Sequence, residues 1–527
     1  MRSIATGEDM PMQNSDTKVA LRYHSSTNHS MMSLMGDSWK LDWSNRPIPY
    51  KIYTSLESIL LPTDLPSSPV PALDAIASTA PTGSEEQIPD LQMLARLCFF
   101  SNGVTKYLRR ASDERLAVRA AACTGALFHI ELYIVCGDLP DLAAGVYHFS
   151  AHDTSLRLLR AGDFRQVLVQ ASANEPSLAR APVIMVHIST FWRNAWKYQA
   201  RAYRHAFWDD GTILANFLAV ASATQMPTKL VTGFVDEAVN QLLGIDGLHE
   251  AALTLVALGH TQQAAPQAPT VAQLHLPTAP LSRKEVDFPL IQEMHRSSTL
   301  ASTEEVVAWR GHPEPHELPA AHGPRIPLQP IDPSNLPDTP IETVIRKRGS
   351  TRQFEQAPIS FGQLSTMLLH TTRGIPADSL DPAGRLLSDV YLIVIAVDGL
   401  QPGTYVFHPE RQEIELLKGG TFRRAAQYLA LGQDLGGDAA VNIYFLLDLE
   451  PVLARSGNRG YRLAQLEAAI TAGKLYLAAY ALDLGATGLT FFDDDVTKFF
   501  SPHAQGKSVM FLIALGHPLK RTKSTLP

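Results

Sequence analysis

The chain repeats itself at a fixed distance, and this repeat limits the folds that are open to it. The segment "GVYHFSAHDTSLRLLRAGDFR" (145–165) aligns without a gap on "GTYVFHPERQEIELLKGGTFR" (403–423), with eight of 21 positions identical and an offset of 258 residues. The same offset carries "RAYR" (201–204) onto "RGYR" (459–462). A duplication of this length predicts two structural units of one kind rather than a single large domain.

Each copy contains the same succession of elements. Apolar, β-branched runs predict buried strands, and a long segment rich in Ala and Leu predicts a helix. In the first copy the strands are 130–136 and 183–189, the helix is 203–223, and the closing strand that ends in Leu-Gly-His is 251–260. In the second copy the same segments are 390–397, 441–448, 461–483 and 509–517. The offset also pairs Asp236–Glu237 with Asp494–Asp495. Helices packed on a sheet in both copies predict an α+β fold.

The predicted domains are residues 15–262 and 336–527. The first contains an insertion at 31–85, whose aromatic residues we expect to pack an arm onto the core. Between the domains, residues 263–335 are rich in Pro, Gln and His and show little periodicity. We therefore expect a long linker that wraps the surface.

Composition excludes several classes of partner. The 527 residues carry a formal net charge of −7, which provides no basic field for nucleic acid or an anionic membrane. Three cysteines predict no disulfide framework and a cytoplasmic location, and the N-terminus lacks the apolar segment of a signal peptide. No apolar run is long enough to span a bilayer, and no His or Cys pair has zinc-ligand spacing, so we expect no metal.

The segment "RGSTRQF" (348–354) places two arginines and a hydroxyl within five residues. In an extended segment Arg348, Ser350 and Arg352 point to one side, so three donors can converge on one anion. Arginine suits phosphate because its planar fork donates two hydrogen bonds at once. The alternative is a solvated basic face before a helix.

Followed by the repeated elements, this segment resembles the opening motif of the nitroreductase superfamily of flavin enzymes. The resemblance implies that Arg348, Ser350 and Arg352 bind the phosphate and ribityl chain of FMN. Gly349 stands where a second Arg or a His is usual. The closing "GHPLKR" (516–521) is similar to the family's last segment, and this similarity makes Lys520 and Arg521 further phosphate ligands.

The first copy resembles one branch of that superfamily, the SagB-type dehydrogenases. "RAAACTGALFHIELYIV" (119–135) is similar to the branch's Pro-Ser-Ala-Gly segment along the flavin, with Cys123 for Ser, Thr124 for Ala, and Gly125 kept. We assign Cys123 no redox role. "FWRNAWKYQARAYRHAFWDDG" (191–211) resembles the branch's Lys-Tyr loop, which makes Lys197 and Tyr198 the candidate catalytic residues. "VTGFVDEAVNQLLG" (231–244) resembles its Gly-Phe segment, which places Gly233 beside the flavin.

The branch implies oxidation of thiazoline or oxazoline rings in peptides, with FMN accepting hydride while a base removes a ring proton. Lys197 and Tyr198 suit that base only if their surroundings lower a pKa toward neutrality. Two other functions remain open. One is reduction of nitroaromatics or quinones with NAD(P)H, and the other is a non-catalytic flavin- or peptide-binding scaffold.

Nitroreductases are homodimers whose flavin sites use both subunits, so a tandem duplication predicts two three-layer domains joined as an internal pseudo-dimer, possibly monomeric. One site would combine Arg348, Ser350 and Arg352 with the first copy's Lys197 and Tyr198. The reciprocal site would use "YHSSTNHS" (23–30) as its Arg-rich segment, with His24 and Asn28 in place of arginines. It would also have "DPAG" (381–384), with Phe491 at the position of Gly233. We therefore expect one tightly bound FMN per chain.

Overall fold

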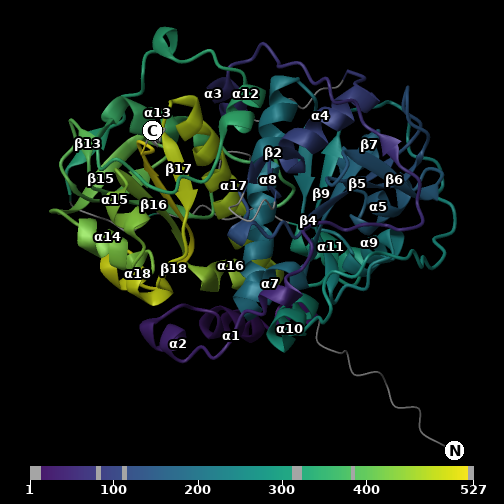
Figure 1. Ribbon diagram of the computed structural model, residues 1–527, viewed down its shortest axis with the longest axis horizontal. Coiled ribbons are helices and arrows are strands. Elements are labelled where there is room, and N and C mark those ends of the chain that lie inside the picture. Colours follow the sequence, from purple (N-terminus) through teal and green to yellow (C-terminus); the bar gives the residue numbers. More distant parts are fainter. Residues whose placement is uncertain are drawn as a thin grey trace, which may run out of the picture.

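The structure is a computed structural model, and it describes residues 13–78, 85–109, 115–310, 318, 323–380 and 386–519. Two halves lie side by side, each built on a seven-stranded sheet (Figure 1). We call residues 13–262 the N-terminal half, 323–519 the C-terminal half, and 263–322 the connecting segment. Among the described helices, none is long and apolar enough to cross a lipid bilayer.

The two sheets have the same strand order. In the N-terminal half it is β1 (Ile59–Leu60), β6 (Ser155–Ala161), β5 (Gly145–Ser150), β4 (Ile130–Cys136), β7 (Val183–Thr190), β9 (Glu250–Leu258) and β8 (Thr228–Val231). In the C-terminal half it is β10 (Arg325–Pro327), β15 (Glu413–Gly419), β14 (Gly403–His408), β12 (Asp389–Val394), β16 (Val441–Leu447), β18 (Ser508–Gly516) and β17 (Gly485–Gly488). All neighbouring pairs are antiparallel, and the fold is α+β, as the repeat predicts.

Each half has three layers. The period of two along β4 sends Leu132 and Ile134 toward the centre of the molecule, and Tyr133 and Val135 toward the outer helices. Those outer helices are α5 (Arg165–Ala171), α6 (Pro176–Ala179) and α9 (Asp236–Leu243), with α14 (Arg423–Leu429), α15 (Asp434–Asp438) and α18 (Asp493–Phe500) in the other half. Both faces of each sheet are therefore covered (Figure 1).

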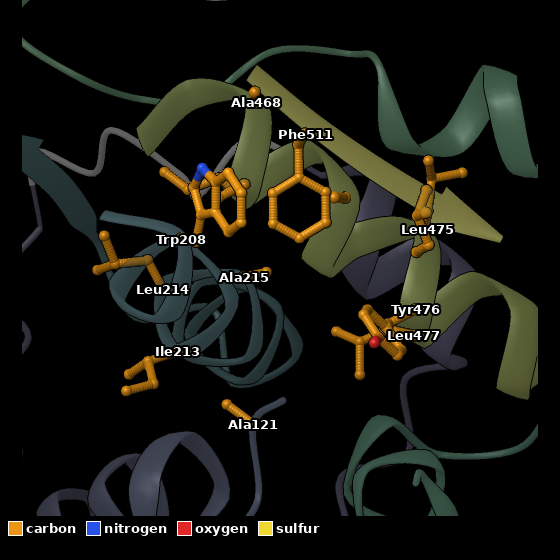
Figure 2. Packing of buried hydrophobic residues seen from close by; sticks show 14 of the residues in the cluster. Ala121, Trp208, Ile213, Leu214, Ala215, Ala468, Leu475, Tyr476, Leu477 and Phe511 are labelled. Atoms are coloured by element: carbon orange, nitrogen blue, oxygen red, sulfur yellow. The ribbon is translucent and has the colours of Figure 1, made fainter. Parts of the chain in front are cut away.

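The two long helices α8 (Ala202–Ala223) and α17 (Arg459–Ala481) pack against each other between the sheets. A Cβ added at Gly211 would lie 2.5 Å from Cβ of Ala469, and one added at Gly473 would lie 2.6 Å from Cβ of Ala215. Glycine is therefore required for the helices to approach this closely. Figure 2 shows side chains of both helices, such as Trp208 and Leu475, in one apolar cluster that continues across the halves.

Each half also contains a pair of shorter helices that precedes its long central helix. Helices α3 (Ala72–Ala77) and α4 (Leu91–Asn102) correspond to α12 (Ile341–Lys347) and α13 (Phe361–Thr371). Pro71 and Pro340 immediately precede α3 and α12 and form an antiparallel bridge with each other. This pairing is expected near a two-fold axis that relates the halves.

The predicted correspondence needs one correction of register. Gln225 and Asp483, which follow the two long helices with positive φ, are 258 residues apart, but α9 and α18 begin at Asp236 and Asp493, which are 257 apart. The counterpart of Asp236 is therefore Asp493 and not Asp494. For the same reason Thr490, not Phe491, stands at the position of Gly233. A one-residue deletion in a short connection left no mark in the ungapped alignment.

The predicted insertion and linker also need correction. Helix α3, inside 31–85, is part of the repeated core, and β10, inside 263–335, pairs with β15 of the second sheet. The connecting segment does not simply wrap the surface, because it forms α10 (Pro289–Ser297) and α11 (Thr303–Trp309) with buried apolar residues. These short helices were not predicted because the segment is rich in Pro and Gln and shows little helical periodicity.

Candidate functional site

The segment "RGSTRQF" lies against the opposite half of the molecule. Arg348 is 3% exposed and donates from Nε to the carbonyl oxygen of Ala120 (2.9 Å) and from Nη2 to that of Arg119 (3.2 Å). Lys106, on β2 (Val104–Arg109), donates from Nζ to the carbonyl oxygen of Arg348 (2.8 Å). Two of the three guanidinium nitrogens of Arg348 thus join the halves, and Nη1 remains for a ligand.

The rest of the segment is more open to a ligand. The backbone N–H of Thr351 donates to Ala486 on β17 (2.9 Å), which fixes the segment to its own sheet. Ser350 is half-buried and Arg352 is exposed. Lys520 and Arg521, the other predicted phosphate ligands, lie outside the described residues.

Lys197 and Tyr198 end helix α7 (Phe191–Tyr198) of the N-terminal half. The helix ends here because Gln199 adopts a φ of 50°, a backbone conformation that residues other than glycine rarely adopt. One turn earlier, the indole of Trp196 packs edge-on against Trp43, with ring centroids 5.3 Å apart. The aromatic arm predicted for the 31–85 insertion therefore covers this helix end.

Tyr198 lies directly over Gly125. A Cβ at Gly125 would be 2.8 Å from the Tyr198 hydroxyl oxygen, and the φ of Gly125 is 66°, so both space and backbone require glycine. Nζ of Lys197 lies 5.0 Å from the centroid of the Tyr198 ring. The charge of Arg352 acts on both side chains. Residues of both halves thus meet here, and we call Gly125, Lys197, Tyr198, Ser350 and Arg352 the candidate site.

The pKa values of the two candidate bases shift in opposite directions. Burial lowers the pKa of Lys197, and the nearby charges of Arg46 and Arg352 lower it further. Burial raises the pKa of Tyr198, with Asp209 and Cys123 adding to the effect. Lys197 therefore moves toward a neutral amine, whereas Tyr198 keeps its proton. The predicted role of Tyr198 as a base is at odds with this shift, which makes it a hydrogen-bond donor instead.

One residue that supports the site was missing from the sequence prediction. Asp209 of α8 is 3% exposed and accepts hydrogen bonds from the backbone N–H (2.8 Å) and hydroxyl (2.7 Å) of Thr124, and it also contacts Nε2 of His129 (2.9 Å). These bonds hold η3 (Thr124–Ala126) in place under Tyr198. The signal was present, since a carboxylate inside an apolar buried helix requires partners.

Cys123 also contacts Asp209, with Sγ 2.9 Å from Oδ2. Burial and the carboxylate of Asp209 raise the pKa of this thiol well above its ordinary value. A thiol that keeps its proton is a poor nucleophile. This agrees with a structural role for Cys123.

The candidate site fits a phosphate-bearing flat cofactor such as FMN. Within the described part of the chain, Arg46, Lys106, Lys197 and Arg352 form no ion pair with a carboxylate. The pKa values of Lys106 and Lys197 are both lowered, by burial first and then by neighbouring arginines. A bound anion would relieve this repulsion between cations. Arg352, Ser350 and Nη1 of Arg348 would hold the phosphate and ribityl chain, and Gly125 would let the ring approach the backbone.

Gly233 is not part of this group, although it was predicted as a cofactor ligand. Its N–H donates to Oδ2 of Asp378 (3.0 Å), and a Cβ there would lie 3.0 Å from the indole of Trp309. The same Trp309 contacts Ser456 and Arg459 of the C-terminal half, which correspond to Tyr198 and Arg201. We call Gly233, Asp378, Ser456 and Arg459 the reciprocal site.

The segment 23–30, predicted as the Arg-rich strand of the reciprocal site, is not there. Nδ1 of His24 contacts the hydroxyl of Tyr461 (3.2 Å), and the side-chain oxygen of Asn28 accepts from Arg204 (2.7 Å), both at the base of the long helices. Because α3 corresponds to α12, the sequence that aligns with 348–352 is 79–83, "TAPTG", which contains no cation and lies outside the described residues. The trans segment 381–384 lies outside the described residues.

Two halves with one strand order, joined through long central helices and with a candidate site between them, define a duplicated α+β fold. A model of the nitroreductase family matches residues 146–260 and 345–517, more than half of the chain, and the chain belongs to this family. Members of the family typically bind flavin.

Individual relatives agree with this assignment. The chain is similar to a putative nitroreductase of Methanocaldococcus jannaschii, with 25% identity over 155 residues that cover 29% of this chain and 74% of the relative. It is also similar to the crystal structure of a putative nitroreductase from Anabaena variabilis, with a TM-score of 0.74, 28% identity, and coverage of 95% of this chain and 99% of that one. The doubled architecture thus extends along the whole of that second protein. A chain of the E. coli microcin synthetase McbBCD complex matches with a TM-score of only 0.30 and 15% identity, over 47% of this chain and 96% of that one.

Proposed function

We propose that the protein is an FMN-dependent oxidoreductase that dehydrogenates an azoline or similar dihydro-heterocycle in a peptide or carrier-bound intermediate. The observation that carries this proposal is the lowered pKa of Lys197 at a site completed by Arg352 of the other half. A simple reductase has no need for a base that removes a proton from a ring carbon. When bound, FMN supplies the hydride acceptor that this oxidation requires.

The chain's own residues have distinct tasks in this proposal. In its neutral form, Nζ of Lys197 would take a proton from one ring carbon while a hydrogen on the adjacent ring carbon leaves with its electron pair, so that a double bond forms between these two carbons. Tyr198 keeps its proton and donates a hydrogen bond to a heteroatom of the ring, which orients the substrate. Trp43 and Trp196 pack against each other beside the end of α7, next to the half-buried lysine.

A second function is favoured by the raised pKa of Tyr198. Reduction of a nitro group or quinone with NAD(P)H consumes protons, and a tyrosine that holds its proton at neutral pH can supply one. The lowered pKa of Lys197 has no evident part in that reaction. A variant of Lys197 should therefore affect the oxidation but not the reduction, and this difference separates the two functions.

The test compares Lys197→Ala with Arg455→Ala, its counterpart at the end of α16 (Leu449–Ser456) in the other half. We expect the purified protein to show flavin absorbance, and Lys197→Ala to lower azoline oxidation by about 10²-fold or more with unchanged flavin content. Arg455→Ala should leave both unchanged. Oxidation at the normal rate in Lys197→Ala, alongside reduction of a nitroarene by NADPH, would favour the reductase. Flavin binding without either activity would favour a scaffold.

Because residues of both halves form the candidate site, one chain is sufficient to build it. We therefore expect light scattering to give the mass of a single chain, 57.7 kDa. An obligate tetramer would contradict this internal pairing.

A further inference from the structure

We propose that helix α11 of the connecting segment occupies the reciprocal flavin site, with the indole of Trp309 in the space that corresponds to the flavin ring of the candidate site. This inference rests on the proposed function for the identity of the lost ligand. In this proposal the second site binds no cofactor because a side chain of the same protein occupies it. The symmetry of the halves and the contacts of Trp309 carry it.

The two-fold relation locates the space. In the candidate site the N-terminal half supplies Tyr198, and the two-fold relation assigns the loop that contains Thr490 to the same site from the C-terminal half. Their counterparts in the reciprocal site are Ser456 and Gly233. Any group that touches both Ser456 and Gly233 therefore lies where a ring between Tyr198 and Thr490 would lie in the other site.

Trp309 touches both. Its Nε1–H donates to the carbonyl oxygen of Ser456 (3.0 Å), and its six-membered ring lies 3.0–3.1 Å from the position of a Cβ on Gly233. The guanidinium of Arg459 approaches the same ring, with 5.8 Å from its carbon to the ring centroid. A flat aromatic group thus fills this space, held through a hydrogen bond and a cation–π contact.

The neighbouring residue fastens the helix. Nη2 of Arg310 donates to the carbonyl oxygen of Ser172 (2.8 Å), and Nε lies 3.5 Å from Oδ2 of Asp378. Asp378 is itself the acceptor for the N–H groups of Thr232 and Gly233. The start of α11 is capped by Ser302, and Val306 and Leu300 are buried with Trp309. The helix is therefore integrated into the site and does not merely lie over it.

The reciprocal site retains features of a ligand site beneath this helix. A small cavity between the halves is lined by residues that include Thr232, Trp309, Arg459 and Leu466. Nη2 of Arg459 is buried without a hydrogen-bond partner among the described residues.

The test measures the binding of lumiflavin, a flavin ring without phosphate, to full-length protein stripped of its cofactor. We expect one lumiflavin per chain in the native protein and two in Trp309→Ala, because removing the indole vacates a ring-sized space. The matched control is Val307→Ala, an exposed position of the same helix (61% exposed), which should still bind one. A stoichiometry that stays at one in Trp309→Ala overturns the proposal.

Amide hydrogen exchange of the native protein gives a second test that does not depend on a folded variant. Saturating FMN should slow exchange in residues 197–198 and leave α11 unchanged. Altered exchange in α11 without a change at 197–198 would mean that the flavin binds at the reciprocal site, which overturns the proposal. A native protein that binds no flavin would refute the proposed function, whereas a lumiflavin site gained in Trp309→Ala would still support the role of α11.

Discussion

Asp236, at the start of α9, accepts a hydrogen bond from Nη1 of Arg459 at 2.6 Å, and this buried pair joins the N-terminal half to the C-terminal half. Arg462 contacts the other carboxylate oxygen at 2.9 Å. The symmetric arrangement is present as well, since Asp493 binds Arg204 at 2.6 Å and Arg201 at 3.0 Å. The motifs "RAYR" and "RGYR" are therefore the cross-links between halves.

Asp236→Asn should destabilise the protein. The change leaves two buried guanidinium groups without a counter-charge, and breaking a buried ion pair on one side costs about 3–5 kcal/mol. The free energy of unfolding from a denaturant titration measures the effect. Glu237→Gln, at the exposed neighbouring position, is the control and should change it by less than about 0.5 kcal/mol. Equal effects of the two substitutions would contradict the role given to the pair.

Gly211→Ala should also destabilise, although alanine favours helices over glycine by up to about 1 kcal/mol. The added methyl would overlap Cβ of Ala469 at 2.5 Å, and overpacking of a core costs about 1–3 kcal/mol or more. The double variant Gly211→Ala with Ala469→Gly removes the contact between the two Cβ atoms and should recover part of the loss, because the added methyl would still lie 2.9 Å from backbone atoms of Ala469 and Ile470. Thermal unfolding of the single and double variants distinguishes overlap from a general effect of the substitution.

Glu467 predicts a pH dependence of stability. It corresponds to Asp209 in the other long helix, and burial raises its pKa to about 7. Because the pKa is higher in the folded state, the protonated carboxyl stabilises the folded protein fully below the unfolded pKa near 4.5. This stabilisation is lost as the pH rises through 7. Between these pH values we expect the free energy of unfolding of the native protein to fall by up to about 3 kcal/mol because of Glu467, and we expect this fall to be absent in Glu467→Gln. Denaturant titrations across this range measure it, with exposed Glu450→Gln as the control. Parallel curves for native protein and Glu467→Gln would be the contrary result.

Asp209→Asn should weaken flavin binding by about tenfold or more, because one acceptor for the loop at Thr124 becomes a donor that faces other donors. An unsatisfied buried group costs about 1–3 kcal/mol. The control is Asp210→Asn, which loses bonds to His187 and Thr254 in the core instead. Comparable stability of the two variants, with flavin affinity lowered only in Asp209→Asn, is the expected pattern. Unchanged flavin affinity in Asp209→Asn would show that the loop does not contact the cofactor.

The architecture could be predicted from the sequence because the repeat is nearly free of gaps across its strands and long helices. The strand ranges and α8 and α17 follow directly from the apolar runs. The register at α9 and α18 was not predicted, since a single deleted residue in a short connection changes no local preference. Likewise, "TAPTG" after α3 does not resemble "RGSTR", and these residues lie outside the described part of the chain.

The candidate site was predictable where a motif carried the chemistry, as for Arg352, Lys197 and Gly125, and its role in flavin binding stays a prediction. Asp209 and Lys106 were not predicted, because each acts on a segment that is distant in sequence. Helix α11 did have a local signal, since Ser302 precedes Glu305 by three residues in the pattern of a helix start. No local sequence pattern indicated that Trp309, the last residue of this helix, contacts residues of both halves.

The contact between Gly211 and Ala469 has a consequence for how this protein can evolve. In a dimer of identical chains, a residue on the symmetry axis always meets its own copy, so glycine must face glycine or alanine must face alanine. Here each crossing pairs unlike partners, Gly211 with Ala469 and Ala215 with Gly473. Such a knob and its hollow can arise only after the two copies are encoded separately. Each side of this contact can therefore change without the same change on the other side, which a dimer of identical chains does not allow.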